Sequence, residues 1–128
     1  MILTEAGLGP AVESLADRTS VDVSVDVGAE RFSPAVEGAA YFVVSEALAN
    51  VAKYAKATKA MVRVRGLDDH MTIEVNDDGI GGADPRSGSG LRGLADRLAA
   101  LDGTMSIVSP IGGGTRISAQ IPTIQPVG

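Results

Sequence analysis

Strict alternation of apolar and polar residues is the feature that most limits what this chain can fold into. The clearest case is VDVSVDV at 21–27, which predicts a strand whose valines all face the core. Later in the chain, similar stretches predict two pairs of strands, each joined by a short turn. They lie at 58–66 and 70–77, around the turn LDD, and at 104–110 and 114–122, around the turn IGGG.

Segments with helical periodicity separate these strands. The first covers 9–18 and is expected to open at Pro10. The longest starts after Ser33, a suitable N-cap, and runs to about Ala55. The last covers 91–101, where leucines recur every three or four residues, and stops at the pair DG. Helices and antiparallel strand pairs on one chain favour an α+β fold, a two-layer α/β sandwich, over a doubly wound sheet.

Composition narrows the class of function. The 128 residues suffice for one compact domain, taken as 1–128. The formal net charge of −5 disfavours a nucleic-acid surface, which needs clustered Lys and Arg to neutralise phosphates. Cysteine is absent, so disulfides and thiolate metal sites are excluded. Without a signal peptide or an apolar run long enough to cross a bilayer, a cytoplasmic location is expected.

The stretch GSGLRG at 88–93 matches the G-x-G-x-x-G pattern of dinucleotide-binding loops. Such a loop must follow a strand directly and have an acidic residue about 20 residues further on. Here the stretch ADPRSGSG, instead of a strand, precedes the helix. The position about 20 residues further on, where an acidic residue is required, falls in the glycine turn IGGG. The phosphate-loop pattern G-x-x-x-x-G-K-[ST] is absent as well. Neither of these nucleotide loops is therefore expected.

The longest predicted helix carries Glu46, Asn50 and Lys53 at spacings of four and three, so the three side chains share one face. The amide oxygen of an asparagine suits Mg²⁺, a glutamate can accept from a metal-bound water, and a lysine can contact a phosphate. This face could hold a metal–nucleotide complex. A solvated polar face of an amphipathic helix is the alternative interpretation.

The sequence DDGIGG directly after a predicted strand forms a second candidate site. Asp77 would sit at the strand end, where its carboxylate can accept a hydrogen bond from an amino group. Gly79 and Gly81 would let the backbone come close to a flat ligand. The alternative is an ordinary Asp-Gly turn.

Four motifs follow one another along the chain: SEALANVAKYAKA, NDDGIGG, GSGLRGLADRLAALDGTM and GGGTRISAQIP. In this order they resemble the GHKL ATP-binding domain of gyrases, chaperones and histidine kinases. They most resemble the catalytic ATP-binding domain of sensor histidine kinases that pair with helix-turn-helix response regulators. The resemblance implies a Bergerat-type sandwich with a mixed sheet covered on one face by about three helices.

The resemblance also implies roles for individual residues. Asn50 would ligate Mg²⁺, Glu46 would position metal-bound water or polarise the transfer site, and Lys53 would touch phosphate. Asp77 would accept the adenine amino group, with Thr115 helping through a nearby water. Two further groups of residues are implied. Room for the purine would come from Gly79 and Gly81, and the lid that closes over the phosphates would include Gly88, Gly90, Leu91 and Gly93.

By this resemblance the chain would bind Mg-ATP and deliver the γ-phosphate to a histidine on a separate dimerisation segment. The partners implied are the histidine-bearing dimerisation domain of a homodimeric parent kinase, which could be membrane-anchored, and a response regulator. The sole histidine of this chain, His70, falls in a predicted hairpin turn and is interpreted as structural. The isolated chain is not expected to autophosphorylate.

Two alternatives remain open at the level of sequence. One is a free-standing GHKL serine kinase that regulates a sigma factor. The other is a nucleotide-binding interaction module that does no phosphoryl transfer. The presence of both Glu46 and Asn50 disfavours the second.

Overall fold

The computed structural model describes residues 7–52, 56–81 and 91–123. These ranges contain helices and strands that alternate in the order expected from the sequence. The helices are α2 (Leu8–Asp17), α3 (Pro34–Asn50) and α4 (Leu91–Ala99). The strands are β1 (Asp22–Val27), β2 (Lys59–Gly66), β3 (His70–Asp77), β4 (Thr104–Val108) and β5 (Thr115–Pro122).

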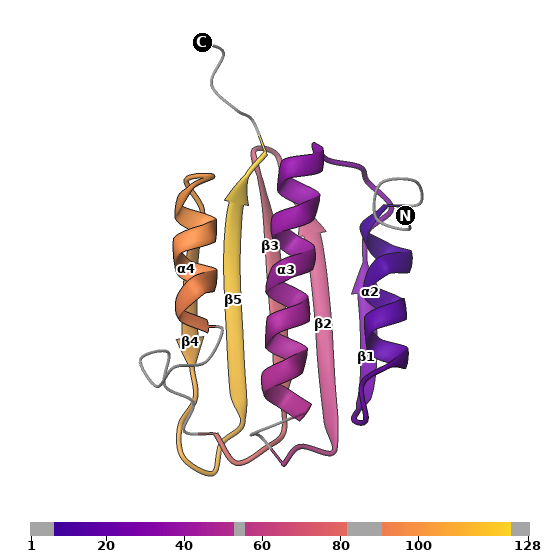
Figure 1. Ribbon diagram of the computed structural model, residues 1–128, viewed down its shortest axis with the longest axis vertical. Coiled ribbons are helices and arrows are strands. Elements are labelled where there is room, and N and C mark those ends of the chain that lie inside the picture. The colour runs from indigo at the N-terminus through magenta and orange to yellow at the C-terminus, as the bar shows by residue number, and fades with distance from the viewer. Residues whose placement is uncertain (1–6, 53–55, 82–90, 124–128) are drawn as a thin grey trace.

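The strands form one five-stranded sheet in the order β1-β2-β3-β5-β4. β1 runs parallel to β2, whereas the pairs β2–β3, β3–β5 and β4–β5 are antiparallel. The three described helices all cover the same face of this sheet (Figure 1). The prediction of a two-layer α+β sandwich with a mixed sheet and about three helices on one face is confirmed.

The core lies between the sheet and the helices. Every second residue of β2, β3 and β5 is buried, which follows from the two-residue period of a strand. The valines of β1 are half-buried because this strand lies at the sheet edge. Helix α3 is apolar on nearly all sides because it contacts α2, α4, β3 and β5 together.

The predicted start of α3 agrees with the structure, and that of α2 differs. Ser33 caps α3 as expected, since its side chain accepts a hydrogen bond from the Val36 amide. The α-helix is regular as far as Asn50 and a π-helical turn follows at 51–52, whereas the predicted end near Ala55 lies outside the described residues. Helix α2 begins two residues before Pro10, which is tolerated because the amides of a first helical turn have no partner within the helix.

The stop after α4 also works differently from the expectation. Asp102, not the glycine, takes the left-handed conformation, with φ of +59°. Gly103 donates its amide to the Leu98 carbonyl at 2.7 Å, and a Cβ at Gly103 would crowd the Gln120 carbonyl. The glycine is therefore required by packing against β5.

Strand β4 ends at Val108, short of the predicted end at Pro110. Proline has no amide hydrogen to donate to the neighbouring strand.

An ion pair between the half-exposed Arg31 and the buried Glu37 anchors the connection between β1 and α3. Glu37 is only 2% exposed, and its carboxylate accepts from Arg31 Nε at 2.9 Å and Nη2 at 3.1 Å. The Phe32 amide also donates to it, at 3.2 Å. The hydrogen bonds from Arg31 are the main reason that the pKa of Glu37 is lowered. Sequence analysis did not identify this pair, which fixes the start of α3 over the sheet.

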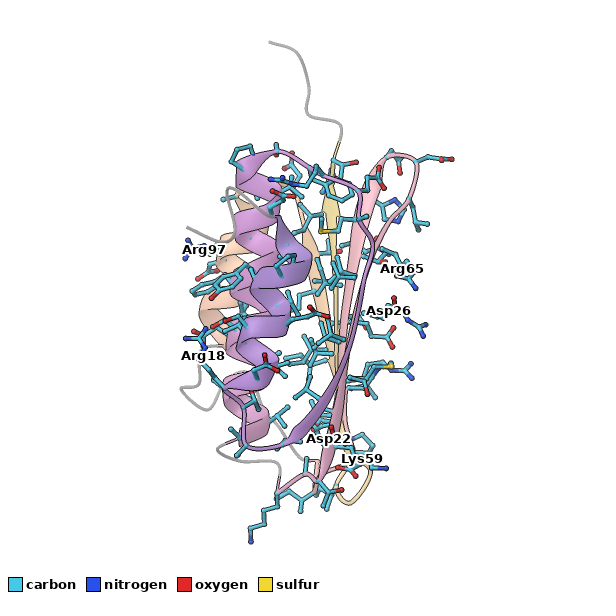
Figure 2. All side chains as sticks on the ribbon, turned by 90° about the vertical axis from the view of Figure 1, so that its right-hand side faces the viewer. Arg18, Asp22, Asp26, Lys59, Arg65 and Arg97 are labelled. Atoms are coloured by element: carbon cyan, nitrogen blue, oxygen red, sulfur yellow. The ribbon has the colours of Figure 1, made fainter. Side chains whose placement is uncertain are left out.

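The other face of the sheet carries polar and charged side chains that point away from the helices (Figure 2). There Asp26 pairs with Arg65, and it lies 3.8 Å from Arg63. These ion pairs are exposed, and such pairs contribute little to stability. None of the helices in the described ranges has the length and apolar character needed to cross a membrane.

Candidate functional site

One end of the sheet brings together the ends of several elements. Helix α3 ends there, β3 ends there, and β5 and α4 begin there (Figure 1). These ends carry Asn50, Asp77, Thr115 and Leu91. The predicted site residues that the structure describes therefore meet at one end of the fold.

A row of small and polar residues crosses the sheet at this end. Asp77 is opposite Ala60 on one side and Thr115 on the other. Val75 and Ile117, two positions further into these strands, are buried beneath the helices. Since side chains two apart in a strand share a face, Asp77 and Thr115 also face the helix layer. The row thus forms a polar border to the apolar core.

The carboxylate of Asp77 is held by its own turn. Its Oδ1 accepts a hydrogen bond from the Gly79 amide at 2.8 Å, the pattern of an Asx turn. No described residue donates to Oδ2, so among these residues this carboxylate oxygen remains available to a ligand. The sequence DDGIGG can therefore form a turn through one oxygen of Asp77 and still offer the other oxygen to a ligand.

Asp78 fastens the same loop to β2. Its Oδ1 accepts from the amides of Thr58 at 2.8 Å and Lys59 at 3.0 Å, and its Oδ2 accepts from Thr58 Oγ1 at 2.6 Å. The hydrogen bond from the Thr58 hydroxyl, followed by those from the two amides, lowers the pKa of Asp78 to about 2. This clamp was not predicted from the sequence.

Asp78→Asn should make stability less dependent on pH in the acid range. Because the pKa of Asp78 is lowered from 3.8 to about 2 on folding, its contribution is complete above pH 4 and is lost as the pH falls toward 2. Melting curves should show the variant less stable than the wild type at pH 7, with the difference shrinking below pH 4. The exposed Asp68, mutated to Asn, is the control. A constant difference down to pH 2.5 would contradict the clamp.

Two glycines allow the turn between β4 and β5 to pack against the loop after β3. Gly81 has φ of +68°, and a Cβ there would overlap the Pro110 carbonyl. Gly114 has φ of +75°, and a Cβ there would overlap the Asp77 carbonyl. The Gly112 amide also donates to the Ile80 carbonyl at 2.6 Å. Gly81 thus has a packing role in the fold, and room for a purine at Gly79 and Gly81 stays a prediction.

Helix α3 presents its polar face at the same end. Glu46 and Asn50 are half-buried, whereas Val44, Leu48 and Val51 are buried, so the predicted polar residues and the core residues lie on different faces of this helix. The Nδ2 atom of Asn50 is buried and has no hydrogen-bond partner among the described residues. An unpaired buried polar group costs about 1–3 kcal/mol, so this amide is suited to a polar ligand. Lys53 lies outside the described residues.

Helix α4 contributes its amino end. Its backbone begins at Leu91, and Gly93 lies exposed in the first turn. The first amides of a helix have no partner within the helix and attract anions. No described atom lies within 4 Å of the place where a Cβ of Gly93 would stand. Gly88, Gly90 and the predicted lid at 82–89 lie outside the described residues.

Gly93→Ala should stabilise the free protein by about 0.5–1 kcal/mol, because glycine in a helix is less favourable than alanine and the site has room. The same methyl group should weaken ATP binding more than adenosine binding, since it would obstruct the approach of phosphates to the backbone. Gly38→Ala, in a similarly open position on α3, is the matched control and should change only stability. An unchanged ratio of ATP to adenosine affinity in Gly93→Ala would argue against the phosphate role.

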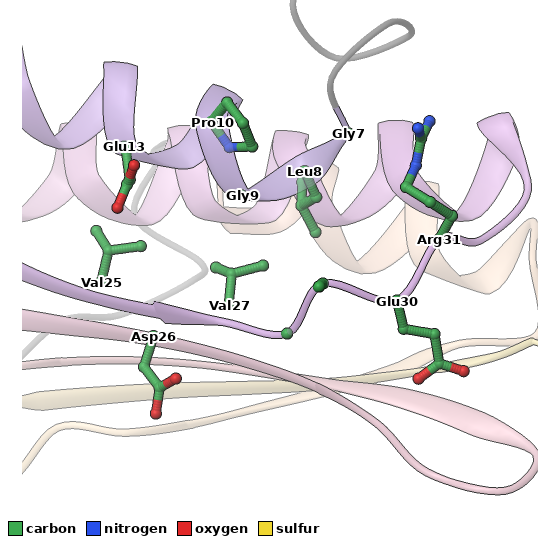
Figure 3. A pocket seen from close by; sticks show the side chains of 12 residues that line it. Gly7, Leu8, Gly9, Pro10, Glu13, Val25, Asp26, Val27, Glu30 and Arg31 are labelled. Carbon is green, nitrogen blue, oxygen red and sulfur yellow. The ribbon is translucent and has the colours of Figure 1, made fainter.

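A hollow of about 410 Å³ lies elsewhere, between the first turn of α2 and β1 (Figure 3). Its lining includes Leu8, Val27 and Arg31 but none of the predicted site residues.

His70 is the first residue of β3, where its Nδ1 lies 2.8 Å from Asp69 Oδ1. Asp77 lies seven residues further along the strand than His70, a distance of about 23 Å. The only histidine of the chain is therefore remote from the candidate site.

The open mixed sheet, the single helix layer and the carboxylate–glycine end of β3 define a GHKL-type sandwich. The chain belongs to the family of histidine kinase-, DNA gyrase B-, and HSP90-like ATPases, which matches residues 35–125.

Curated relatives include two bacterial sensor kinases. The chain is 35% identical over 106 residues to the oxygen sensor histidine kinase NreB of Staphylococcus carnosus, covering 80% of this chain and 30% of the relative. It is 32% identical to the sensor histidine kinase NarS of Mycobacterium tuberculosis, covering 94% of this chain and 31% of the relative. The chain thus spans about a third of the length of these relatives.

Solved structures share the fold. The histidine kinase domain of the Erythrobacter litoralis EL346 blue-light activated histidine kinase superposes with a TM-score of 0.78 at 22% identity, over 92% of this chain and 60% of that chain. The mycobacterial sensor histidine kinase MprB superposes with a TM-score of 0.65 at 22% identity, over 98% of this chain and 97% of that chain. At these identities the likeness supports the fold alone.

Proposed function

We propose that this chain binds Mg-ATP and delivers the γ-phosphate to a histidine on a separate dimerisation segment, in two-component signal transduction. The observation that carries the proposal is the buried Nδ2 of Asn50, which has no hydrogen-bond partner among the described residues, at the same end of the fold as Asp77 Oδ2, to which no described residue donates. A metal–nucleotide complex would occupy both groups. The names of the relatives, all sensor histidine kinases, support the same class of reaction.

In this proposal the sheet recognises the base. The free carboxylate oxygen of Asp77 accepts the adenine amino hydrogen, and Thr115 lies opposite Asp77 to assist. The braced loop keeps this oxygen in place without a ligand, because Asp78 and the glycine contacts fix both sides of it. Binding would therefore require little reordering of the base site.

The helices would hold the phosphates. The amide oxygen of Asn50 is the ligand for Mg²⁺, which would neutralise charge on the phosphates and on the group in transit. Glu46 lies one turn earlier on the same face and would orient a water or the incoming acceptor. The first amides of α4 would face the phosphate oxygens. Lys53, Gly88, Gly90 and Leu91 keep their predicted phosphate and lid roles.

The phosphoryl acceptor would come from outside the described fold. Transfer requires the acceptor atom in line with the γ-phosphate at near-contact distance. His70 does not meet this condition, because it lies at the opposite end of β3. A histidine-bearing dimerisation domain of a homodimeric parent and a response regulator are the partners we propose.

Calorimetric titration with ATP, with and without Mg²⁺, tests the binding step. Binding that strengthens with Mg²⁺ is expected, and no binding at millimolar ATP would overturn the proposal. Labelled ATP with the histidine-bearing segment of a parent kinase tests transfer. That segment should become labelled, and Glu46→Ala should suppress labelling whereas Glu13→Ala on α2 should not.

Other outcomes would favour other functions. Acid-labile label on His70 would contradict the separate acceptor. Label on a serine of an added partner protein would favour the serine kinase that regulates a sigma factor. Mg-ATP binding without transfer to any supplied segment would favour a non-catalytic module.

A further inference from the structure

We propose that Ser109 is a positioning residue for base recognition, which donates its hydroxyl hydrogen to Thr115 so that Thr115 can donate its own to a ring nitrogen of adenine. The inference rests on the proposed function, since it assigns a further residue to the same ATP site. It concerns a side chain that follows β4 and that the sequence motifs did not indicate.

The geometry places Ser109 at the end of the polar row. Ile107 on β4 is opposite Ile117 on β5, and Ser109 and Thr115 lie two positions beyond this pair, on the same face in the same antiparallel register. Their hydroxyl oxygens lie 2.7 Å apart, the usual length of a hydrogen bond between hydroxyl groups. The Gly114 carbonyl, at 3.5 Å from Ser109 Oγ, is a much weaker acceptor. Thr115 in turn is opposite Asp77.

The chemistry of adenine decides the direction of this hydrogen bond. Its Watson–Crick edge presents an amino donor beside a ring nitrogen, N1, that accepts. A carboxylate such as Asp77 only accepts, so it serves the amino group and cannot serve N1. We assign the donor for N1 to the hydroxyl of Thr115, which lies opposite Asp77 and would contact the ring nitrogen directly. Thr115 has one hydroxyl hydrogen, and it is free for this purpose only if Ser109 is the donor in their mutual bond.

This arrangement predicts selectivity in addition to affinity. When Ser109 donates to it, the Thr115 hydroxyl rotates so that its hydrogen points away from Ser109 and toward the ligand. Without Ser109 the Thr115 hydroxyl can rotate freely. Removal of the Ser109 hydroxyl should therefore lower the affinity for a nucleotide whose base has an acceptor at position 1. It should not change the affinity for a nucleotide whose base has none.

Calorimetry with ATP and with 1-deaza-ATP, which carries C–H in place of N1, tests the inference. Ser109→Ala should weaken ATP binding about three- to tenfold, the range for one hydrogen bond, and leave 1-deaza-ATP binding unchanged. Ser109→Thr, which keeps the hydroxyl, should restore the preference for ATP. Ser106→Ala, an exposed serine on β4, is the matched control and should change neither affinity.

The outcomes separate this inference from the proposed function. If the wild type binds ATP but Ser109→Ala weakens both nucleotides equally or neither, the positioning role is wrong and the proposed function stands. If the wild type binds no ATP, the positioning role of Ser109 and the proposed function are both wrong. If Ser109→Ala unfolds, Ser109→Cys replaces it, because cysteine is similar in size and its thiol is a weaker donor. This variant must also lose affinity for ATP and keep its affinity for 1-deaza-ATP. An unchanged preference for ATP over 1-deaza-ATP in Ser109→Cys would overturn the inference.

Discussion

Asp77→Ala should weaken ATP binding about tenfold to more than a hundredfold, because a hydrogen bond to a charged group contributes about 1.5–3 kcal/mol and the neighbouring groups would be left without a partner. The Gly79 amide, which donates to Asp77 Oδ1, would lose its acceptor as well. Calorimetric titration of both proteins with ATP measures the change.

The choice of purine provides an independent check on this result. Guanine presents a carbonyl oxygen where adenine presents its amino group, and a carboxylate repels it. The wild type should therefore bind GTP far more weakly than ATP. Asp68→Ala, in the exposed turn between β2 and β3, is the control and should change neither affinity. Equal affinities for ATP and GTP in the wild type would contradict the role of Asp77.

Asn50→Ala should remove most of the Mg²⁺-dependent part of ATP affinity and leave adenosine binding nearly intact. The amide oxygen is the proposed metal ligand, and adenosine carries no phosphate to bridge to a metal. Titrations of ATP with and without Mg²⁺, compared with titrations of adenosine, measure the two parts separately.

The same variant makes an unusual prediction about stability. Because Nδ2 of Asn50 is buried without a partner among the described residues, its removal should leave the melting temperature of the free protein unchanged or raise it. A structural asparagine would behave in the opposite way, with lower stability and equal losses for ATP and adenosine. Asn76→Ala, on the outer face of the sheet, is the control and should leave the effect of Mg²⁺ unchanged.

Local patterns predicted the elements that depend on neighbours in the sequence. The face shared by Glu46 and Asn50 follows from the period of a helix, and the place of Asp77 follows from the end of an alternating stretch. Both were correct because nearby residues determine them.

The parts of the site that depend on distant residues could not be predicted in the same way. The contact of Ser109 with Thr115 exists only because β4 pairs with β5 in one register. Asp78 reaches Thr58, which is 20 residues away, across the pairing of β2 with β3. Gly114 is required by the backbone of Asp77 on another strand. Each depends on the arrangement of strands in the sheet.

The bracing of the loop after β3 has a consequence for chemical inhibition. Asp78 and the glycine contacts hold the Asp77 carboxylate through residues of β2, β3 and the turn before β5. A small aromatic amine that mimics only the purine could therefore bind a rigid surface that is already in place before the ligand arrives. Such fragments should bind with high efficiency per atom, because little conformational freedom is lost in the protein. Potency would then be gained by growing the fragment toward Asn50.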